Sequence, residues 1–177
     1  MSEAPNSKFT NYQGSWVKKF EEEKKKLLVV FGDLAIEIQH IGNTSIPGMS
    51  AKPIIDIAVL IESIDDIDKI VSMLNSLGYS YEPSMSSAER IFFRKGESVE
   101  YHVSVACPAH TFWLRQILFR DYLRSHSEFV KEYEELKNGN LKVTPEEDFE
   151  DLSFSEVYNR GKSEFVKKVL DLAEKEK

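Results

Sequence analysis

The sequence predicts an α+β fold in which helices flank a small mixed β-sheet and the C-terminal half is helical. Strand patterns, either alternating or rich in β-branched residues, cluster in the first half of the chain, and most helix-period patterns lie in the second half. With 41% apolar residues among 177, the chain can bury a sizeable core. We therefore expect a single domain over residues 1–177, with a flexible tail at residues 1–12.

Charge and cysteine content exclude several classes of protein. The 23 Lys and Arg residues against 30 Asp and Glu residues give a net charge of −7, so we expect no binding to duplex nucleic acid. Cys107 is the only cysteine, which excludes an intramolecular disulfide and indicates a reducing, cytoplasmic location. No apolar run approaches the roughly 20 residues that span a bilayer. Residues 1–10 lack a signal-peptide pattern, so we expect neither membrane insertion nor export.

The first half of the chain begins with a helix and two strands. Apolar residues share one face of a helix over Ser15–Phe31, whose charged run Glu21–Lys26 predicts a solvated face. Alternation of apolar and polar residues predicts a strand over Leu34–Ile41, and the β-branched run Ile54–Ile61 predicts a central strand. Asp65 is placed to cap the helix that follows.

Two further strands and several helices complete the prediction. The serine-rich segment Tyr81–Glu89 predicts a mobile loop, and Thr144–Glu147 has the form of a capping box. The remaining elements are a hairpin of strands Ile91–Arg94 and Val99–Val105 and the helices His110–Ser125, Ser127–Lys137 and Ser155–Lys175.

A polar loop bounded by glycines, Gly42–Gly48, separates the first two predicted strands. Gly42 permits a close approach of the backbone to a ligand, and Asn43, Thr44 and Ser45 add polar groups that suit a phosphate. The alternative is a tight turn in which these side chains hydrogen-bond to their own backbone. Taken alone, the loop favours the tight turn.

Asp56 is the residue that favours a ligand site over a simple tight turn. A carboxylate inside an apolar strand costs several kcal/mol of desolvation unless it is paired or binds a metal. Lys52 lies four residues earlier and is an internal partner that would explain Asp56 without any ligand. His40, by contrast, alternates with apolar residues, and we expect it to be a partly buried histidine with its own hydrogen-bond partner.

The predicted strand Val99–Val105 has one apolar face and one face that carries Glu100, His102 and Ser104. His102 and Glu100 suit a general base and its orienting group, or metal ligands beside Asp56 if the two strands are neighbours. A polar row that faces solvent explains the same pattern equally well.

Basic side chains that can neutralise an anion are scattered along the chain. Arg94 alternates with Phe92 and Arg90, and Arg120 lies on a polar arc of its predicted helix. Together with Lys52, Arg94 and Arg120 are the candidates for contacting phosphate. The local motifs of P-loop, Rossmann and hydrolase sites are absent from the sequence.

Two adjacent motifs, His40–Gly48 and Ala51–Ile57, resemble the signature of the GrpB family. Tyr101–Val103 and Phe119–Arg124 agree with the family pattern, and the resemblance spans essentially the whole chain. Asn43 stands where the family usually has serine. The resemblance implies a nucleotidyltransferase-like fold. Members of the family are also found fused to dephospho-CoA kinase, which implies a link to coenzyme A metabolism.

The resemblance also implies roles for individual residues. By position, Gly42–Ser45 match a phosphate-contacting loop, and Asp56 matches a metal-binding carboxylate. Active nucleotidyltransferases hold Mg²⁺ with Asp-x-Asp, whereas Ala58 stands at the second acidic position here. Glu100 is the candidate replacement ligand, and a contribution from His102 would suit Mn²⁺ better than Mg²⁺.

These observations predict a protein that binds a nucleotide or another phosphorylated small molecule. The glycine-bounded loop would hold phosphates, Asp56 would carry Mg²⁺ or Mn²⁺, and the three basic side chains would neutralise charge. In a catalytic protein, His102 would act as the base in nucleotidyl transfer to an acceptor. The alternative, which Ala58 favours, is a ligand-sensing or partner-binding module that has lost the second metal carboxylate and does not catalyse a reaction.

Overall fold

The computed structural model describes residues 9–138 and 154–176 of the chain. They form two compact units, one extending to Ile117 and the other beginning at Leu118, so the boundary lies within helix α3 (Phe112–Ser125). The first unit holds the sheet, and the predicted α+β class is confirmed. No described helix is both long and apolar enough to cross a membrane.

The elements of the first unit follow the predicted order. They are α1 (Ser15–Phe31), η1 (Gly32–Leu34), β1 (Glu37–Ile41), η2 (Asn43–Ser45), β2 (Ile55–Leu60), α2 (Ile67–Asn75), β3 (Ser80–Tyr81), η3 (Pro83–Met85), β4 (Arg90–Lys95) and β5 (Tyr101–Ala106), where η denotes a 3₁₀ turn. The first helix begins and ends at the predicted residues. The ends of the strands differ from the predicted ones by one to three residues: β1 and β2 are shorter, β4 is longer by one residue at each end, and β5 begins two residues later and ends one residue later.

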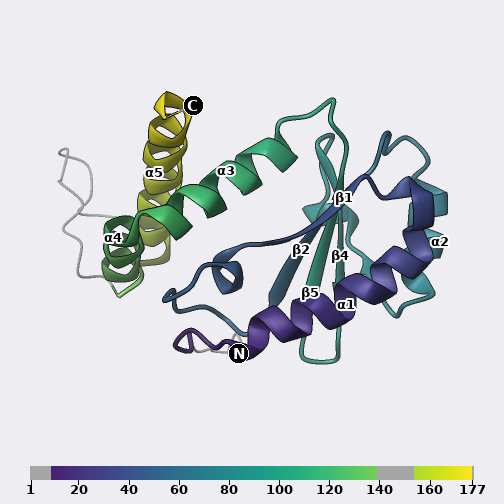
Figure 1. Ribbon diagram of the computed structural model, residues 1–177, viewed down its shortest axis with the longest axis horizontal. Coiled ribbons are helices and arrows are strands. Elements are labelled where there is room, and N and C mark those ends of the chain that lie inside the picture. Colours follow the sequence, from purple (N-terminus) through teal and green to yellow (C-terminus); the bar gives the residue numbers. More distant parts are fainter. Residues whose placement is uncertain (1–8, 139–153, 177) are drawn as a thin grey trace. The chain divides into compact units, whose positions relative to one another are not determined.

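The strands form one mixed sheet in the order β1-β2-β5-β4-β3 (Figure 1). β2 and β5 run parallel to each other, and the other neighbouring strands are antiparallel. β2 is paired along both edges, which agrees with its apolar, β-branched sequence. The small mixed sheet, the central strand and the β4–β5 hairpin are therefore confirmed.

One face of the sheet carries the main hydrophobic core. Ile57 of β2 and Val103 of β5 point to it together with the residues two positions away, because alternate side chains of a strand share a face. Helices α1 and α2 pack on this face, the former through buried side chains such as Trp16 (Figure 1). The intervening residues, which include Asp56 and His102, lie on the opposite face of the sheet.

Local details differ from the prediction at the start of α2. The helix is capped by Asp66, whose side chain accepts a 3.1 Å hydrogen bond from the backbone N–H of Lys69. Asp65, the predicted cap, instead accepts a hydrogen bond from the Ser63 hydroxyl. Adjacent aspartates have the same capping chemistry, so only the backbone geometry selects between them. The segment predicted as a loop after this helix contains β3 and η3.

The predicted N-terminal tail includes one paired residue. Thr10 and Ala51 exchange two backbone hydrogen bonds of 2.9 and 3.0 Å. Residues 1–8 of that tail, and the predicted capping box at residues 144–147, lie outside the described residues.

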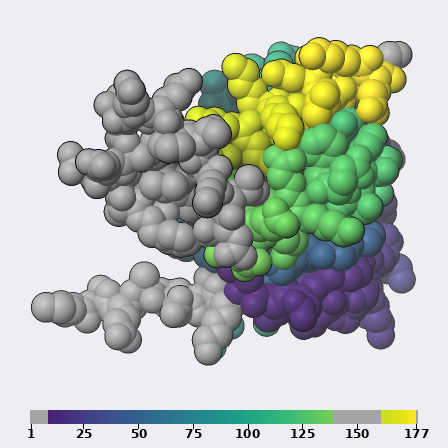
Figure 2. Space-filling model, turned by 90° about the vertical axis from the view of Figure 1, so that its left-hand side faces the viewer, coloured from purple at the N-terminus to yellow at the C-terminus, as the bar shows by residue number. Residues whose placement is uncertain are grey.

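The second unit is helical, as predicted. This unit contains the last part of α3 followed by α4 (Ser127–Lys137) and α5 (Phe154–Lys175). Helices α4 and α5 pack against each other, and their green and yellow surfaces adjoin in Figure 2. Tyr133 stacks on Phe165 with ring centroids 4.8 Å apart, and Phe119 meets both rings edge-on. These aromatic contacts give the unit a small core of its own.

A buried carboxylate ties α1 to the sheet, in contrast to the solvated face that the charged run predicts. Glu23 is fully buried and accepts hydrogen bonds from Lys26 at 2.8 Å, Lys95 at 2.6 Å and the Tyr79 hydroxyl at 3.0 Å. Burial raises the pKa of Glu23, but the donors from Lys26, Lys95 and Tyr79 outweigh it, so the net pKa lies below 4.5. The cluster joins residues far apart in sequence and fixes α1 against β4.

We predict that Glu23→Gln lowers the free energy of unfolding by about 3 kcal/mol, because it leaves the Lys95 ammonium without its anion in a largely buried position. Since the folded pKa is below 4.5, the stabilisation is complete above that pH and is lost as the pH falls below it. Urea unfolding at pH 7 and at pH 3.5 measures both effects. The control is Glu22→Gln, because Glu22 is exposed and its loss should change stability by less than about 0.5 kcal/mol. Equal effects of the two variants would contradict the prediction.

Candidate functional site

The centre of the candidate site is a hydrogen-bonded pair of side chains, Asp56 and His102. They occupy opposing positions on the parallel strands β2 and β5, and His102 Nδ1 lies 2.9 Å from Asp56 Oδ1. The Asp56 side chain is 34% exposed and the His102 side chain is 24% exposed, so both reach solvent. A carboxylate bonded to Nδ1 fixes the orientation of the imidazole and leaves Nε2 as the ring atom available to a ligand.

This pairing resolves the alternatives for Asp56. Its partner is His102, whereas Lys52 is exposed and belongs to no ion pair recorded among the described residues. Asp56 is also more exposed than its apolar strand predicts, so the desolvation penalty is smaller than a buried carboxylate would incur. The sequence placed His102 beside Asp56 only as a metal ligand and only if the two strands are neighbours; they are neighbours, but the hydrogen bond between the two side chains was not predicted.

Gly42 brings the backbone of the loop against Asp56. Its φ of +70° is in the left-handed region, and a Cβ placed on it would lie 2.5 Å from Asp56 Oδ2. Only glycine fits both the backbone conformation and the contact. Gly42 was predicted to bring the backbone close to a ligand; in the structure its backbone lies against the Asp56 carboxylate, which is held between the loop and the imidazole of His102.

The hydroxyls of the loop hold its conformation. Thr44 is buried, with Oγ1 2.9 Å from His40 Nε2 and a 3.3 Å hydrogen bond to the Ile54 carbonyl. Ser45 is buried too, and its hydroxyl donates to the Gly42 carbonyl at 2.6 Å. Ser45 behaves as the tight-turn alternative predicts, whereas Thr44 bonds outside the loop and Asn43 is only half-buried. His40 stacks on the ring of Phe20 and is satisfied, as expected.

Arg90 is the basic residue that the structure brings toward this pair. Its guanidinium donates to the Ser104 hydroxyl at 2.8 Å and lies 4.6 Å from the Phe92 ring centroid and 5.1 Å from that of Phe112. Burial lowers the pKa of Arg90, and the negative charge of Asp56 partly offsets this shift. Sequence reasoning missed Arg90 and selected Arg94, because both arginines alternate with Phe92 and nothing local separates them.

The other predicted basic residues have different surroundings. Arg94 pairs in register with His102, but its side chain is 48% exposed and donates to Glu82. Arg120 belongs to the second unit, where its Nε donates to Asp121 Oδ1 at 2.7 Å. Arg120 is buried, unlike a residue on the polar arc that the helical pattern predicts.

The donor set limits the kind of metal site that this chain can form. Glu100 is exposed and precedes β5, where its backbone bonds to Lys95 and Ile55. Within residues 9–138 and 154–176, no group of three or more His, Cys, Asp or Glu side chains is arranged to hold a metal ion. Asp56 alone fits an ion that keeps its water and phosphate ligands, as Mg²⁺ does at nucleotide sites, but not a resident ion held by protein alone.

Comparisons with known proteins agree on the family and the fold. The sequence matches the family model described as GrpB protein over residues 7–172. It is 37% identical over 157 residues to UPF0157 protein YqkA of Bacillus subtilis (strain 168), a match that covers 88% of this chain and 44% of that protein. The chain thus spans less than half the length of this relative.

A solved structure of a GrpB protein supports the family and the fold, and part of the chain also matches a dephospho-CoA kinase. The crystal structure of conserved protein GrpB from Enterococcus faecalis has a TM-score of 0.77 at 31% identity and covers 96% of this chain and 98% of that chain. A shorter stretch of 68 residues is 34% identical to dephospho-CoA kinase of Mycobacterium bovis, covering 37% of this chain and 17% of that protein.

We predict that Gly42→Ala destabilises the protein by about 2–4 kcal/mol, because the added methyl group meets Asp56 and the backbone keeps a left-handed φ. The matched control is Gly48→Ala, since Gly48 has a φ of +81° but open space around a Cβ. The control should lose only the conformational part, about 1–2 kcal/mol. Urea unfolding of both variants measures the difference, and equal losses would show that contact with Asp56 is unimportant.

Proposed function

The chain belongs to the GrpB family, and we propose that it binds a nucleotide or a related phosphorylated small molecule on the sheet face that carries Asp56 and His102. The observation that carries the proposal is the partly exposed Asp56–His102 pair, held at a 2.9 Å hydrogen bond and closed on one side by the backbone of Gly42. Paired, oriented and accessible polar groups on rigid strands are typical of ligand sites.

Positive charge beside the pair supports a phosphorylated ligand. Arg90 is fixed by Ser104 and by two aromatic rings, so its guanidinium loses little freedom when it meets an anion. Lys52 is exposed and supplies further positive charge, whereas the charge of Arg94 is balanced by Glu82. In the loop, the half-buried Asn43 and the backbone remain for contact with phosphate, because the neighbouring hydroxyls are bonded internally.

The pair also supports a role in proton transfer. In nucleotidyl transfer, an acceptor hydroxyl forms a bond to the α-phosphorus, the bond to the pyrophosphate leaving group breaks, and the hydroxyl proton must be removed. His102 Nε2 would take that proton, and Asp56 would stabilise the resulting imidazolium through Nδ1. A Mg²⁺ or Mn²⁺ ion that arrives with the phosphates would supply charge neutralisation, with Asp56 as its protein ligand.

One observation favours a second candidate, a binding module without turnover. Ala58 lies on the same strand face as Asp56, at the position of the second carboxylate, and is fully buried. Its methyl group is closed off from solvent, so this position offers no ligand to a second ion. The chain would then bind its ligand and report it to a partner.

The test measures both binding and turnover. We expect at least one of ATP, GTP, CTP, UTP and dephospho-CoA to bind in isothermal titration calorimetry, performed with and without Mg²⁺ or Mn²⁺. Dephospho-CoA is included because of the partial match to dephospho-CoA kinase. In the presence of Mg²⁺ or Mn²⁺, Asp56→Ala and His102→Gln should each weaken binding at least about tenfold, a loss of roughly 1.4 kcal/mol. Asp68→Asn, an exposed carboxylate of α2, is the control and should have no effect.

The outcomes separate the two candidates. Triphosphate consumption that disappears in both site variants supports the transferase, and tight binding without consumption supports the module. If none of the five compounds binds, or if the site variants bind as well as the wild type, the proposed site is wrong.

A further inference from the structure

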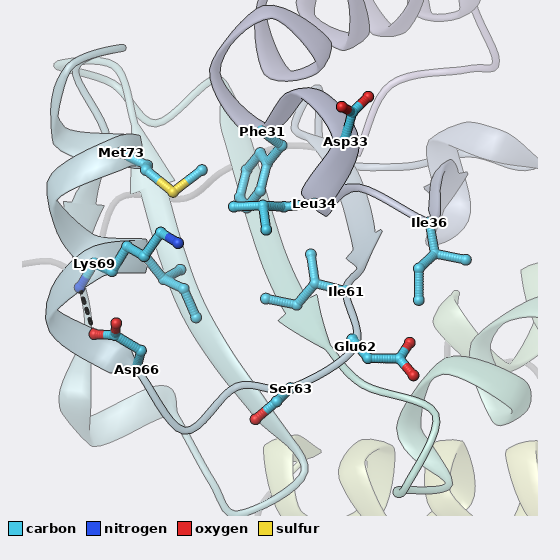
Figure 3. A pocket seen from close by; sticks show the side chains of 11 residues that line it. Phe31, Asp33, Leu34, Ile36, Ile61, Glu62, Ser63, Asp66, Lys69 and Met73 are labelled. Carbon is cyan, nitrogen blue, oxygen red and sulfur yellow. Dashed lines mark hydrogen bonds between the residues drawn. The ribbon is translucent and has the colours of Figure 1, made fainter.

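A second pocket lies near the end of β2, and we infer that it binds a small monocarboxylate with an apolar body. The pocket lies among the end of α1, the residues that follow β2 and helix α2 (Figure 3). Its volume of about 360 Å³ falls at the lower end of the range for small-molecule sites, roughly 300–1,000 Å³. It is a different site from the one proposed for phosphorylated ligands.

Apolar side chains form the walls of this pocket. Phe31, Ile61 and Ile70 are buried in the lining, while Leu34 and Ile36 are 44% and 52% exposed at the surface. Large aliphatic side chains that line a cavity and still face water lose accessible apolar area when a ligand covers them. The walls therefore suit the apolar body of a ligand.

The ammonium group of Lys69 is the charge that points into the pocket. Lys69 and Met73 are four positions apart, so they lie on one face of α2, next to the buried Ile70. Figure 3 shows the Lys69 amino group directed into the space bounded by Met73, Phe31 and Ile61. A lysine on a surface usually places its ammonium in water while its methylene stem covers apolar residues. Here the ammonium extends over apolar walls, where an anion complements it.

The carboxylates of the lining leave this ammonium available. Figure 3 shows the carboxylates of Asp33 and Glu62 directed away from the pocket. Asp66 caps α2 by accepting a 3.1 Å hydrogen bond from the backbone N–H of Lys69, and its charge offsets the positive end of that helix. In the part of the chain that the structure describes, the Lys69 ammonium forms no ion pair. Its positive charge can therefore meet a ligand.

One ammonium selects a ligand with one negative charge. Asp33 and Glu62 are exposed, so their charges are screened by salt, whereas the Lys69 ammonium meets the ligand directly. A phosphate dianion would carry more charge than Lys69 balances. A carboxylate carries a single charge, and apolar walls that exclude water strengthen its ion pair with Lys69 relative to a fully exposed one.

The pocket and the proposed phosphate site lie on opposite faces of the sheet. Ile61 belongs to the core with Ile57, whereas Asp56 lies on the other face. Asp56 and Ile61 are also five positions apart along one extended segment, which places them roughly 17 Å apart. A small ligand in the pocket therefore does not contact Asp56.

The experiment compares three ligands that share a phenyl group and a short chain and differ in charge. They are 3-phenylpropionate as the anion, 3-phenylpropionamide as the neutral analogue and 3-phenylpropylamine as the cation. Amide chemical shifts of the isotope-labelled full chain are followed by NMR during titration at pH 7. We expect 3-phenylpropionate to shift the amides of the lining residues saturably. The neutral amide should bind about fivefold more weakly, and the amine more weakly still.

Lys69→Met tests the charge, because methionine keeps an unbranched, apolar side chain. It should weaken 3-phenylpropionate binding about fivefold and leave 3-phenylpropionamide binding unchanged, a difference that a merely structural effect would not produce. The control is Lys25→Met, since Lys25 is an exposed lysine of α1 that does not line the pocket.

A second substitution tests the apolar wall. Leu34→Asp should abolish 3-phenylpropionate binding by placing an anion in the pocket, and the fold should tolerate it because Leu34 is partly exposed. Val29→Asp is its control, since Val29 is 84% exposed on α1 and does not line the pocket. This control should bind 3-phenylpropionate as the wild type does.

The results that overturn the inference are equally defined. They are the absence of saturable shifts at the lining residues, equal binding of the amide or the amine, and unchanged carboxylate binding in Lys69→Met or in Leu34→Asp. Asp56→Ala should leave carboxylate binding unchanged, so a failure at the phosphate site and a failure at this pocket are distinguishable.

Discussion

The parallel pairing of β2 with β5 is the constraint on which the candidate site depends. It places Asp56 opposite His102 although 46 residues separate them in sequence. Because successive side chains of a strand alternate between faces, a slip of one residue would replace His102 with an apolar neighbour on the site face. The core sets the register, since Ile57 and Val103 oppose each other on the buried face. The polar pair is therefore positioned by hydrophobic packing on the other side of the same sheet.

Local patterns predicted the secondary structure because periodicity, caps and short turns act over a few residues. Helix α1 and the hairpin of β4 and β5 follow from such patterns. The partner of Asp56 did not follow, since nothing local determines which strands become neighbours; the sequence offered Lys52 or a metal ion for Asp56, and His102 only as a further ligand of that ion. Arg94 was likewise the arginine selected from the sequence, whereas Arg90 is the arginine that lies near the pair. Tertiary contacts alone distinguish the half-buried guanidinium of Arg90 from the exposed one of Arg94.

The carboxylates of Glu23 and Asp56 differ in burial and in hydrogen-bond partners, and this difference separates a structural role from a functional one. Glu23 is fully buried, and its oxygens accept from charged and phenolic donors that include Lys95 and Tyr79. Those bonds are made within the protein, so this charge serves stability. Asp56 is one-third exposed, bonds to a single histidine, and has its second oxygen beside the backbone of Gly42. Partial exposure leaves the Asp56 carboxylate able to meet a ligand. The sequence pattern predicted the opposite order of burial, with Glu23 on a solvated face and Asp56 inside an apolar strand, because tertiary contacts decide which acid is covered.

The buried Ala58 determines how the charge of a phosphate has to be balanced at this site. Two carboxylates on one strand face retain divalent ions, whereas a single carboxylate that is already bonded to His102 shares at most one ion with the ligand. Most of the positive charge must therefore come from side chains, and Arg90 is the one held in place by both a hydroxyl and aromatic rings. A site that depends on a fixed guanidinium binds its ligand through electrostatics that are present before any metal arrives. Binding and catalysis thus place different demands on this sheet face: Arg90 and the loop contribute to binding before an ion arrives, the Asp56–His102 pair contributes to binding of the ligand together with its ion, and turnover also needs the free nitrogen of His102.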